Sequence, residues 1–310
     1  MEERERKSGI RRREFLRTTS VVTAGVVSGL RCERANGVER EGEGNAGGGD
    51  KLTDCNVTLS RCPWRRLRLD ETDALVAKLR GCGVGQAWAG SFDGLLHKNM
   101  AAVNARLAEE CRRYGRGVLV PFGLVNPKLP RWEEDVRRCH GEHKMPGIRL
   151  HPNYHGYKLD EPVFGELLEL ANGLGLIVQV AVSVEDERTQ HALMQVAHVD
   201  TAPLTELLKA SPGTRIVLLN WFRAVKGELV PKLASAGQVY FDIATVEGVG
   251  GVANLLRQVA DERVLFGSHS PFFYFEAAAL KLKESELAKA QHALVGGGNA
   301  RRLLEGARRG

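Results

Sequence analysis

The sequence predicts a (β/α)8 barrel over residues 51–310. Three observations favour this fold: short β-rich runs alternate with helical patterns, the strand-like runs number eight, and about 260 residues is an ordinary length for eight such units. The predicted strands are 55–59, 86–90, 118–125, 147–151, 177–183, 215–221, 239–244 and 264–267.

The segments between these strands carry Leu, Ala and Val at three- and four-residue spacing, the period of an amphipathic helix. An open doubly wound sheet is the alternative, but neither G-x-G-x-x-G after the first strand nor G-x-x-x-x-G-K-[ST] occurs. We interpret the glycine-rich runs 248–251 and 296–298 as turns. The predicted helices are 72–80, 99–114, 161–172, 201–209, 226–236, 252–259 and 276–287.

The composition is that of an ordinary globular protein, with 43% hydrophobic and 26% charged residues in 310. The 44 Lys and Arg against 38 Asp and Glu give a net charge of +6. Because the basic residues are interleaved with acidic ones, no nucleic-acid partner is expected. No apolar run reaches the roughly 18 residues of a spanning helix, so no integral membrane segment is expected. The six cysteines lack C-x-x-C or zinc-finger spacing, which predicts buried free thiols.

Residues 1–50 are predicted to be a separate leader and disordered linker, because they combine interleaved charges with a glycine-rich end and no sustained apolar period. The run RRREFL at 11–16, followed by a weakly hydrophobic stretch, resembles a twin-arginine export signal. Export to the periplasm is therefore expected. A cytoplasmic protein with a basic tail is the alternative, since no clean Ala-x-Ala site follows and Arg31 comes directly after the apolar stretch.

Polar side chains gather at the carboxyl ends of the predicted strands, where barrels of this type build their active sites. Such groups are costly to bury without partners, so the cluster indicates a ligand or an internal hydrogen-bond network. The candidate catalytic residues are His151, Asp242 and His269, and the candidate substrate-binding residues are Asn56, Thr58, Trp88, Arg149 and Asn220.

Arg149 and His151 flank one residue of a strand, so their side chains are expected on the same interior face. An interior arginine is costly and is most simply explained by an anionic ligand or a fixed carboxylate such as Asp242. His269 ends the last strand, where an imidazole acts as a general acid or base near neutral pH or serves as a structural hydrogen-bonding group. No serine lies in G-x-S-x-G and no cysteine has a reactive context, so covalent catalysis is not predicted.

The order of these segments resembles the amidohydrolase-related family (amidohydrolase family 2) of metal-dependent barrel enzymes, which includes aminocarboxymuconate-semialdehyde decarboxylase-like proteins and lactonases. The resemblance covers residues 52–304 and implies a hydrolase, or alternatively a lyase. It rests on DCNVT at 54–58, PGIRLHP at 146–152, RIVLLN at 215–220, VYFD at 239–242, RVLFGSHSPF at 263–272 and GNARRLL at 298–304.

The sequence departs from the family pattern at the metal ligands. The His-x-His of the first strand is replaced by Asn56 and Thr58, two later histidines fall near Ala181 and at Asn220, and the family's aspartate is His269. Neutral oxygens hold zinc poorly, so the standard metal site is predicted to be lost and no cofactor is expected. A rearranged zinc or manganese site stays open, although Pro152 disfavours a helical pair of His151 and His155.

The leading hypothesis is an enzyme that acts on a small carboxylate or lactone without the standard metal. Arg149 would hold a substrate carboxylate, His269, Asp242 or His151 would move protons, and Asn56 and Asn220 would stabilise a developing oxyanion. The alternatives are a non-catalytic barrel that binds a small anion, and a metal enzyme with rearranged ligands drawn from His151, His155, Asp242 and His269. The only partner predicted is the small anionic ligand, and a homo-oligomer stays open.

Overall fold

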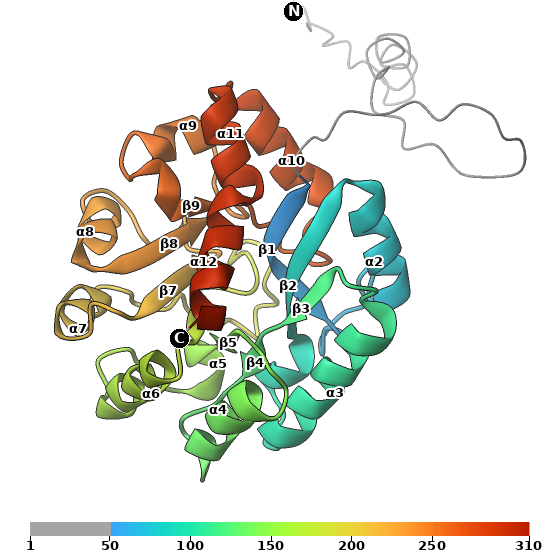
Figure 1. The fold of residues 1–310 in the computed structure, drawn as a ribbon, viewed down its shortest axis with the longest axis vertical. Helices are drawn as coiled ribbons and strands as arrows, with labels where there is room; N and C mark the ends of the chain where they lie inside the picture. Colours follow the sequence, from blue (N-terminus) through green and yellow to red (C-terminus); the bar gives the residue numbers. More distant parts are fainter. Residues whose placement is uncertain (1–50, 310) are drawn as a thin grey trace, which may run out of the picture. The chain divides into compact units, whose positions relative to one another are not determined.

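The computed structural model describes residues 51–309, which form a barrel of parallel strands surrounded by helices (Figure 1). The predicted leader and export signal lie outside the described residues. All eight predicted strand positions are occupied, which confirms the barrel. The strands are β1 (Leu52–Leu59), β2 (Val84–Ser91), β3 (Leu119–Pro121), β4 (Gly123–Leu124), β5 (Gly147–Leu150), β6 (Ile177–Ala181), β7 (Arg215–Leu219), β8 (Gln238–Asp242) and β9 (Val264–Leu265).

The third predicted strand, 118–125, is observed as two pieces, β3 and β4. Phe122 separates them, and Pro121 lacks the N–H that a continuous ladder requires. β3 pairs with β2 and β4 pairs with β5, so the chain passes from one part of the sheet to the other at this point. Phe122 N donates to Ala89 O at 2.8 Å and keeps the two parts together.

The barrel closes between its last strand and its first. Cys55 N donates to Phe266 O, and Thr58 N donates to Ser270 O, each at 2.9 Å. Closure joins the first and last strands of the barrel, and it brings the carboxyl ends of the strands to one face.

All seven predicted helices are present, with ends shifted by up to a few residues. The prediction missed α4, whose charged sequence has only a short apolar stripe, the last helix, α12, and the short helices α5 and α11. The helices of four or more residues are α2 (Thr72–Gly81), α3 (Met100–Tyr114), α4 (Trp132–Gly141), α5 (Pro152–His155), α6 (Pro162–Gly173), α7 (Leu204–Ala210), α8 (Leu229–Ala236), α9 (Gly251–Leu256), α10 (Phe275–Glu284), α11 (Lys289–Ala293) and α12 (Asn299–Arg309).

The helix α12 lies across the barrel (Figure 1) and covers its amino end. Its Ala300, Leu303 and Leu304 pack in one apolar cluster with interior residues that include Trp88 and Phe122. The opposite, carboxyl end is therefore left for a site. Within 51–309 no helix has both the length and the apolar character needed to cross a bilayer.

Four of the five described cysteines, Cys55, Cys62, Cys111 and Cys139, are buried free thiols, as the sequence predicts, whereas Cys82 is only partly buried.

Candidate functional site

Asn56, Asn220 and Asp242 form a buried polar network inside the barrel. Asn56 Nδ2 donates to Asp242 Oδ2 at 2.7 Å and to Asn220 Oδ1 at 2.9 Å. The backbone N–H of Asn220 donates to Asp242 Oδ1 at 3.0 Å. The network joins β1, the end of β7 and β8, so three of the predicted site residues do meet.

Burial raises the pKa of Asp242 to about 7, against the hydrogen bonds from Asn56 and Asn220, which lower it. A second interior carboxyl, Asp54, has its pKa raised to about 6 by burial, although it accepts hydrogen bonds from Ser268 and from the backbone of Asn56. Asp242 can therefore exchange a proton near neutral pH.

Arg149 makes four hydrogen bonds to protein acceptors with its five N–H groups. Its Nε donates to Gln179 Oε1 at 2.8 Å, Nη1 donates to Val57 O at 2.8 Å and to Thr58 Oγ1 at 3.1 Å, and Nη2 donates to Trp88 O at 3.1 Å. These acceptors are neutral and come from β1, β2 and β6. Arg149 thus ties four strands of the barrel interior together.

A glycine makes room for this guanidinium. A Cβ on Gly90 of β2 would lie 2.8 Å from both Cδ and Nη1 of Arg149. Such contacts are shorter than real Cβ atoms tolerate, so the absence of a side chain at position 90 is part of the arginine's binding pocket.

His269 and Asn220 meet at the carboxyl end of the barrel. Both adopt left-handed backbone conformations, with φ of 57° and 54°, which histidine and asparagine accept more readily than most residues. His269 Nε2 lies 2.7 Å from Val184 O, and since a carbonyl only accepts, this nitrogen carries the proton. Burial lowers the pKa of His269 to about 4. The ring is therefore neutral at pH 7, with its lone pair on Nδ1.

His151 lies beside this site without hydrogen-bond partners. Both of its ring nitrogens are buried and unpartnered among the described residues, and burial lowers its pKa well below the usual value. The ring of His155 lies 6.1 Å away, centroid to centroid, and its Nε2 contacts Gly94 O at 2.8 Å. His151 is thus a neutral polar group without a satisfied donor or acceptor, which a ligand or water would satisfy.

A cavity of about 250 Å³ opens directly over Asn220 and His269. We call it the mouth cavity. Arg188, Arg223 and Lys281 line it, together with Glu185, Asp186 and Glu247. Arg188 and Arg223 form ion pairs with Asp186 and Glu247, whereas Lys281 Nζ donates to the carbonyl of Ala244. Burial lowers the pKa of Lys281.

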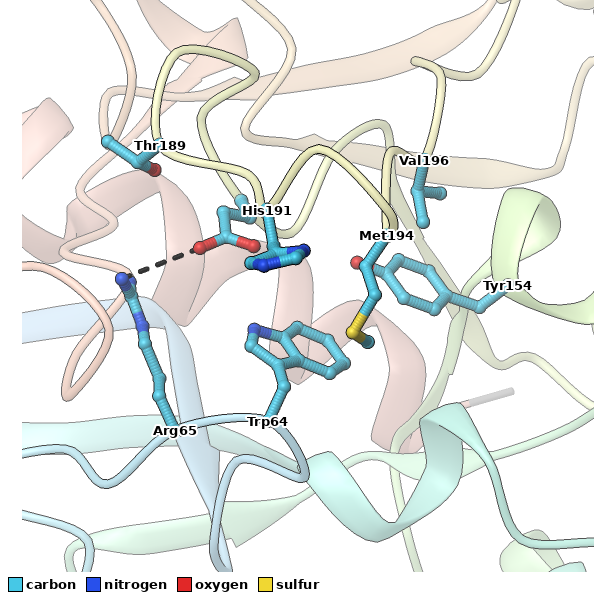
Figure 2. A pocket seen from close by; sticks show the side chains of 8 residues that line it. Trp64, Arg65, Tyr154, Thr189, His191, Met194 and Val196 are labelled. Carbon is cyan, nitrogen blue, oxygen red and sulfur yellow. Dashed lines mark ion pairs between the residues drawn. The ribbon is translucent and has the colours of Figure 1, made fainter.

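A second cavity of about 300 Å³, the aromatic cavity, lies beside the first, and Glu185 lines both. Figure 2 shows the rings of Trp64 and Tyr154 in its wall; their centroids are 5.8 Å apart and their planes nearly parallel. Arg65 pairs with Glu185 at 3.4 Å in the same wall (Figure 2). The Nε1–H of Trp64 is buried and has no partner among the described residues.

Of the predicted site residues, Asn220 and His269 line the mouth cavity, and Asn56 and Asp242 contact Asn220. Thr58 and Arg149 are hydrogen-bonded to each other within the barrel. Trp88 lies away from the mouth: it is fully buried, and its ring stacks on Phe122 at 4.9 Å.

Sequence reasoning missed most of the residues that line the two cavities, although it included Asn220 and His269 among its candidates. Many belong to the 182–203 connection between β6 and α7, which contains no helix or strand. A connection of that length is uncommon in a compact domain and usually functional, so its length was the signal to follow. For Arg65, Arg223 and Lys281, which lie outside this connection, no sequence feature indicated a place in the cavity walls.

The side chains at the family's metal positions do not fit a divalent metal. Asn56 presents a donating amide to Asp242, Asn220 donates to the carbonyl of Ser183, and His269 presents an N–H to Val184. Across residues 51–309 no group of three or more His, Cys, Asp or Glu side chains is placed to hold a metal ion. The rearranged set of His151, His155, Asp242 and His269 is therefore not gathered around one point.

A closed parallel barrel with polar groups at the carboxyl ends of its strands defines the class of (β/α)8-barrel proteins. A family model described as "Amidohydrolase" matches residues 63–306. The chain belongs to the amidohydrolase family. A search of curated proteins found no match.

Solved structures of similar fold include several decarboxylases. Dihydroxybenzoic acid decarboxylase from Polaromonas sp. JS666, with bound manganese and 2-nitroresorcinol, has a TM-score of 0.64 and 15% identity over 82% of this chain and 97% of its own. A 2,6-dihydroxybenzoate decarboxylase from Rhizobium has a TM-score of 0.62 and 13% identity, over 81% of this chain and 99% of its own. A 5-carboxyvanillate decarboxylase from Novosphingobium aromaticivorans was solved with manganese and a nitrobenzoic acid. It has a TM-score of 0.65 and 13% identity, over 82% of this chain and 96% of its own. At these identities the likeness shows the barrel fold alone.

Proposed function

We propose that this chain is an enzyme of hydrolase or lyase type that binds a small carboxylate or lactone in the mouth cavity and works without the family's standard metal. The observation that carries the proposal is the meeting of Asn220 and His269 on the cavity floor. Asn220 Nδ2 lies 3.4 Å from the ring nitrogens of His269, and both residues have left-handed backbones at the ends of their strands. Unusual backbone conformations of this kind concentrate at functional sites.

Each floor residue has a chemical role in this proposal. The neutral His269 accepts a proton from water or a substrate hydroxyl at Nδ1, which Asn220 engages only weakly. Asn220 donates toward a developing negative charge on oxygen. Asp242 and Asn56 act as positioning residues, because their hydrogen bonds to the backbone N–H and the side-chain oxygen of Asn220 hold this residue in place.

The substrate carboxylate is assigned to the cations of the mouth cavity, with Lys281 first. Lys281 is half-buried, and its Nζ donates to the neutral carbonyl of Ala244, so an anion would compensate a charge that burial disfavours. Contact between Arg149 and the substrate stays a prediction, since its guanidinium is bonded to protein acceptors. The neighbouring aromatic cavity suits a substrate with a planar ring, and the decarboxylases of similar fold, which are named for aromatic carboxylates, are compatible with that choice.

The test is turnover by the full chain with hydroxylated benzoates, aliphatic carboxylates and small lactones, each with a chelator and with added manganese. We expect turnover of one class that persists in the chelator. Lys281→Met should raise KM roughly tenfold with a smaller effect on kcat, because it removes a charged contact. His269→Asn should lower kcat while keeping a residue that tolerates the left-handed backbone.

Lys283→Met is the matched control, because Lys283 is exposed on the same helix, α10, and lines neither cavity. It should leave both constants unchanged. Turnover that requires manganese, or substrate binding that survives Lys281→Met and His269→Asn together, would overturn the proposed site.

A further inference from the structure

A third cavity lies at the amino end of the barrel, on the side of α12. It has a volume of about 510 Å³ and lies between α12 and the beginnings of β7, β8 and β9. Its wall includes Arg215, Tyr240, Glu262, Arg263, Arg302 and Gly306. The cavity therefore lies at the opposite end of the barrel from Asn220 and His269, which follow the carboxyl ends of β7 and β9.

Three arginines line this cavity, and within residues 51–309 none of them has a carboxylate partner. Arg215 Nη2 donates to the carbonyl of Gly175, and Arg302 Nη2 donates to Asn299 Oδ1 at 2.6 Å. The guanidinium of Arg263 lies over the ring of Tyr240, 5.1 Å from its centroid. By contrast, Arg188 and Arg223 at the mouth cavity are both ion-paired.

The local charge is positive, since Glu262 is the single acidic residue in this wall. The packing of α12 also leaves Arg215 room: Nη1 of Arg215 lies 3.2 Å from where a Cβ on Gly306 would stand. A larger residue at that turn of α12 would press on the guanidinium. The helix face thus accommodates Arg215 at the cavity wall.

We propose that this cavity binds a small ligand with at least two negative charges on phosphate or carboxylate oxygens, at a site separate from the mouth cavity. Guanidinium groups bind such oxygens through paired, charge-assisted hydrogen bonds, and three arginines line this concave surface against one acidic residue, Glu262. The cavity is large enough for an organic anion rather than an isolated ion. Tyr240 adds an aromatic surface beside Arg263.

Calorimetric titration of the full chain with pyrophosphate and with citrate at low salt tests the assignment. Arg302→Gln and Arg263→Gln should each weaken binding roughly tenfold or more, since each removes a charged contact. Glu262→Gln should tighten binding about threefold by removing the like charge. Arg302 is exposed and Arg263 half-buried, so both variants are expected to fold, and circular dichroism checks this.

Arg257→Gln is the matched control. Arg257 is also exposed and also donates to an asparagine three residues earlier, Asn254, but it does not line the cavity. It should change the affinity by less than about twofold. Preference for pyrophosphate assigns a phosphate-bearing ligand, and preference for citrate assigns a polycarboxylate. Absence of binding by both probes, or equal weakening in Arg257→Gln, would overturn the site.

Discussion

Asn56 and Asp242 lie 186 positions apart in the sequence and meet inside the barrel through a hydrogen bond of 2.7 Å. Gly267, two residues after the end of β9, leaves room for the two side chains. A Cβ on Gly267 would stand 2.9 Å from Asp242 Oδ2 and 3.1 Å from Asn56 Cβ. An amide thus holds the carboxylate at the place where the family pattern has a histidine ligand.

Asn56→Ala should destabilise the fold by about 2 kcal/mol at pH 8, because it leaves one oxygen of a buried, ionised carboxylate without its donor. Since the pKa of Asp242 is raised to about 7, the loss should be smaller at pH 5, where that carboxyl is protonated. Urea unfolding at the two pH values measures this. Asn172→Ala, an exposed change on α6, is the control, and an equal loss at both pH values would argue against the ionised pair.

Gly90→Ala should destabilise the fold by about 1–3 kcal/mol, because the new methyl group displaces the Arg149 guanidinium from its acceptors. Gly81→Ala is the matched control: nothing lies within 4 Å of that Cβ, at the end of α2. Thermal and urea unfolding compare the two variants. Equal stabilities would mean that the Arg149 side chain can move without a loss of stability and that its four hydrogen bonds contribute little to the free energy of unfolding.

His269 should make the free energy of unfolding rise with pH between about 4 and 6.5. Its folded pKa is lowered to about 4, so the unfolded chain binds more protons in this window. The slope from one such group is at most about 1.4 kcal/mol per pH unit. Asp242 and Asp54 act with the opposite sign, because their raised pKa values make the folded chain bind more protons.

The difference in unfolding free energy between the parent chain and His269→Asn isolates the histidine. It should grow from pH 4 to 6.5 and stay constant above. A difference that does not depend on pH would show that the imidazole is not held neutral by burial.

Removal of divalent metals should leave the melting temperature unchanged. The residues at the family's ligand positions are engaged in amide and carbonyl hydrogen bonds, and neutral oxygens bind zinc and manganese weakly. Elemental analysis after dialysis, with melting curves in a chelator and after manganese addition, checks this. Near one metal per chain together with a fall in melting temperature on chelation would restore metal-assisted chemistry as the leading mechanism.

The barrel could be predicted from the sequence because its signals are local. Strand runs such as 215–221 and helical patterns such as 99–114 report their own periodicity, and the structure places elements at both. The splitting of 118–125 was not predictable from hydrophobicity, since it depends on Pro121 failing to donate to a neighbouring strand. The helix α4 was missed because its charged residues outnumber the buried Trp132, Val136 and Cys139.

The sequence by itself determined the barrel and the family, because these depend on residue type and order, and it predicted the replacement of metal ligands by Asn56, Thr58 and Asn220. Only the tertiary structure decided that Arg149 bonds to four protein acceptors, that the 182–203 connection lines the mouth, and that Arg215, Arg263 and Arg302 share a cavity. The reason is that strand register and helix packing determine which distant side chains meet. No local pattern encodes a hydrogen bond between residues 186 positions apart.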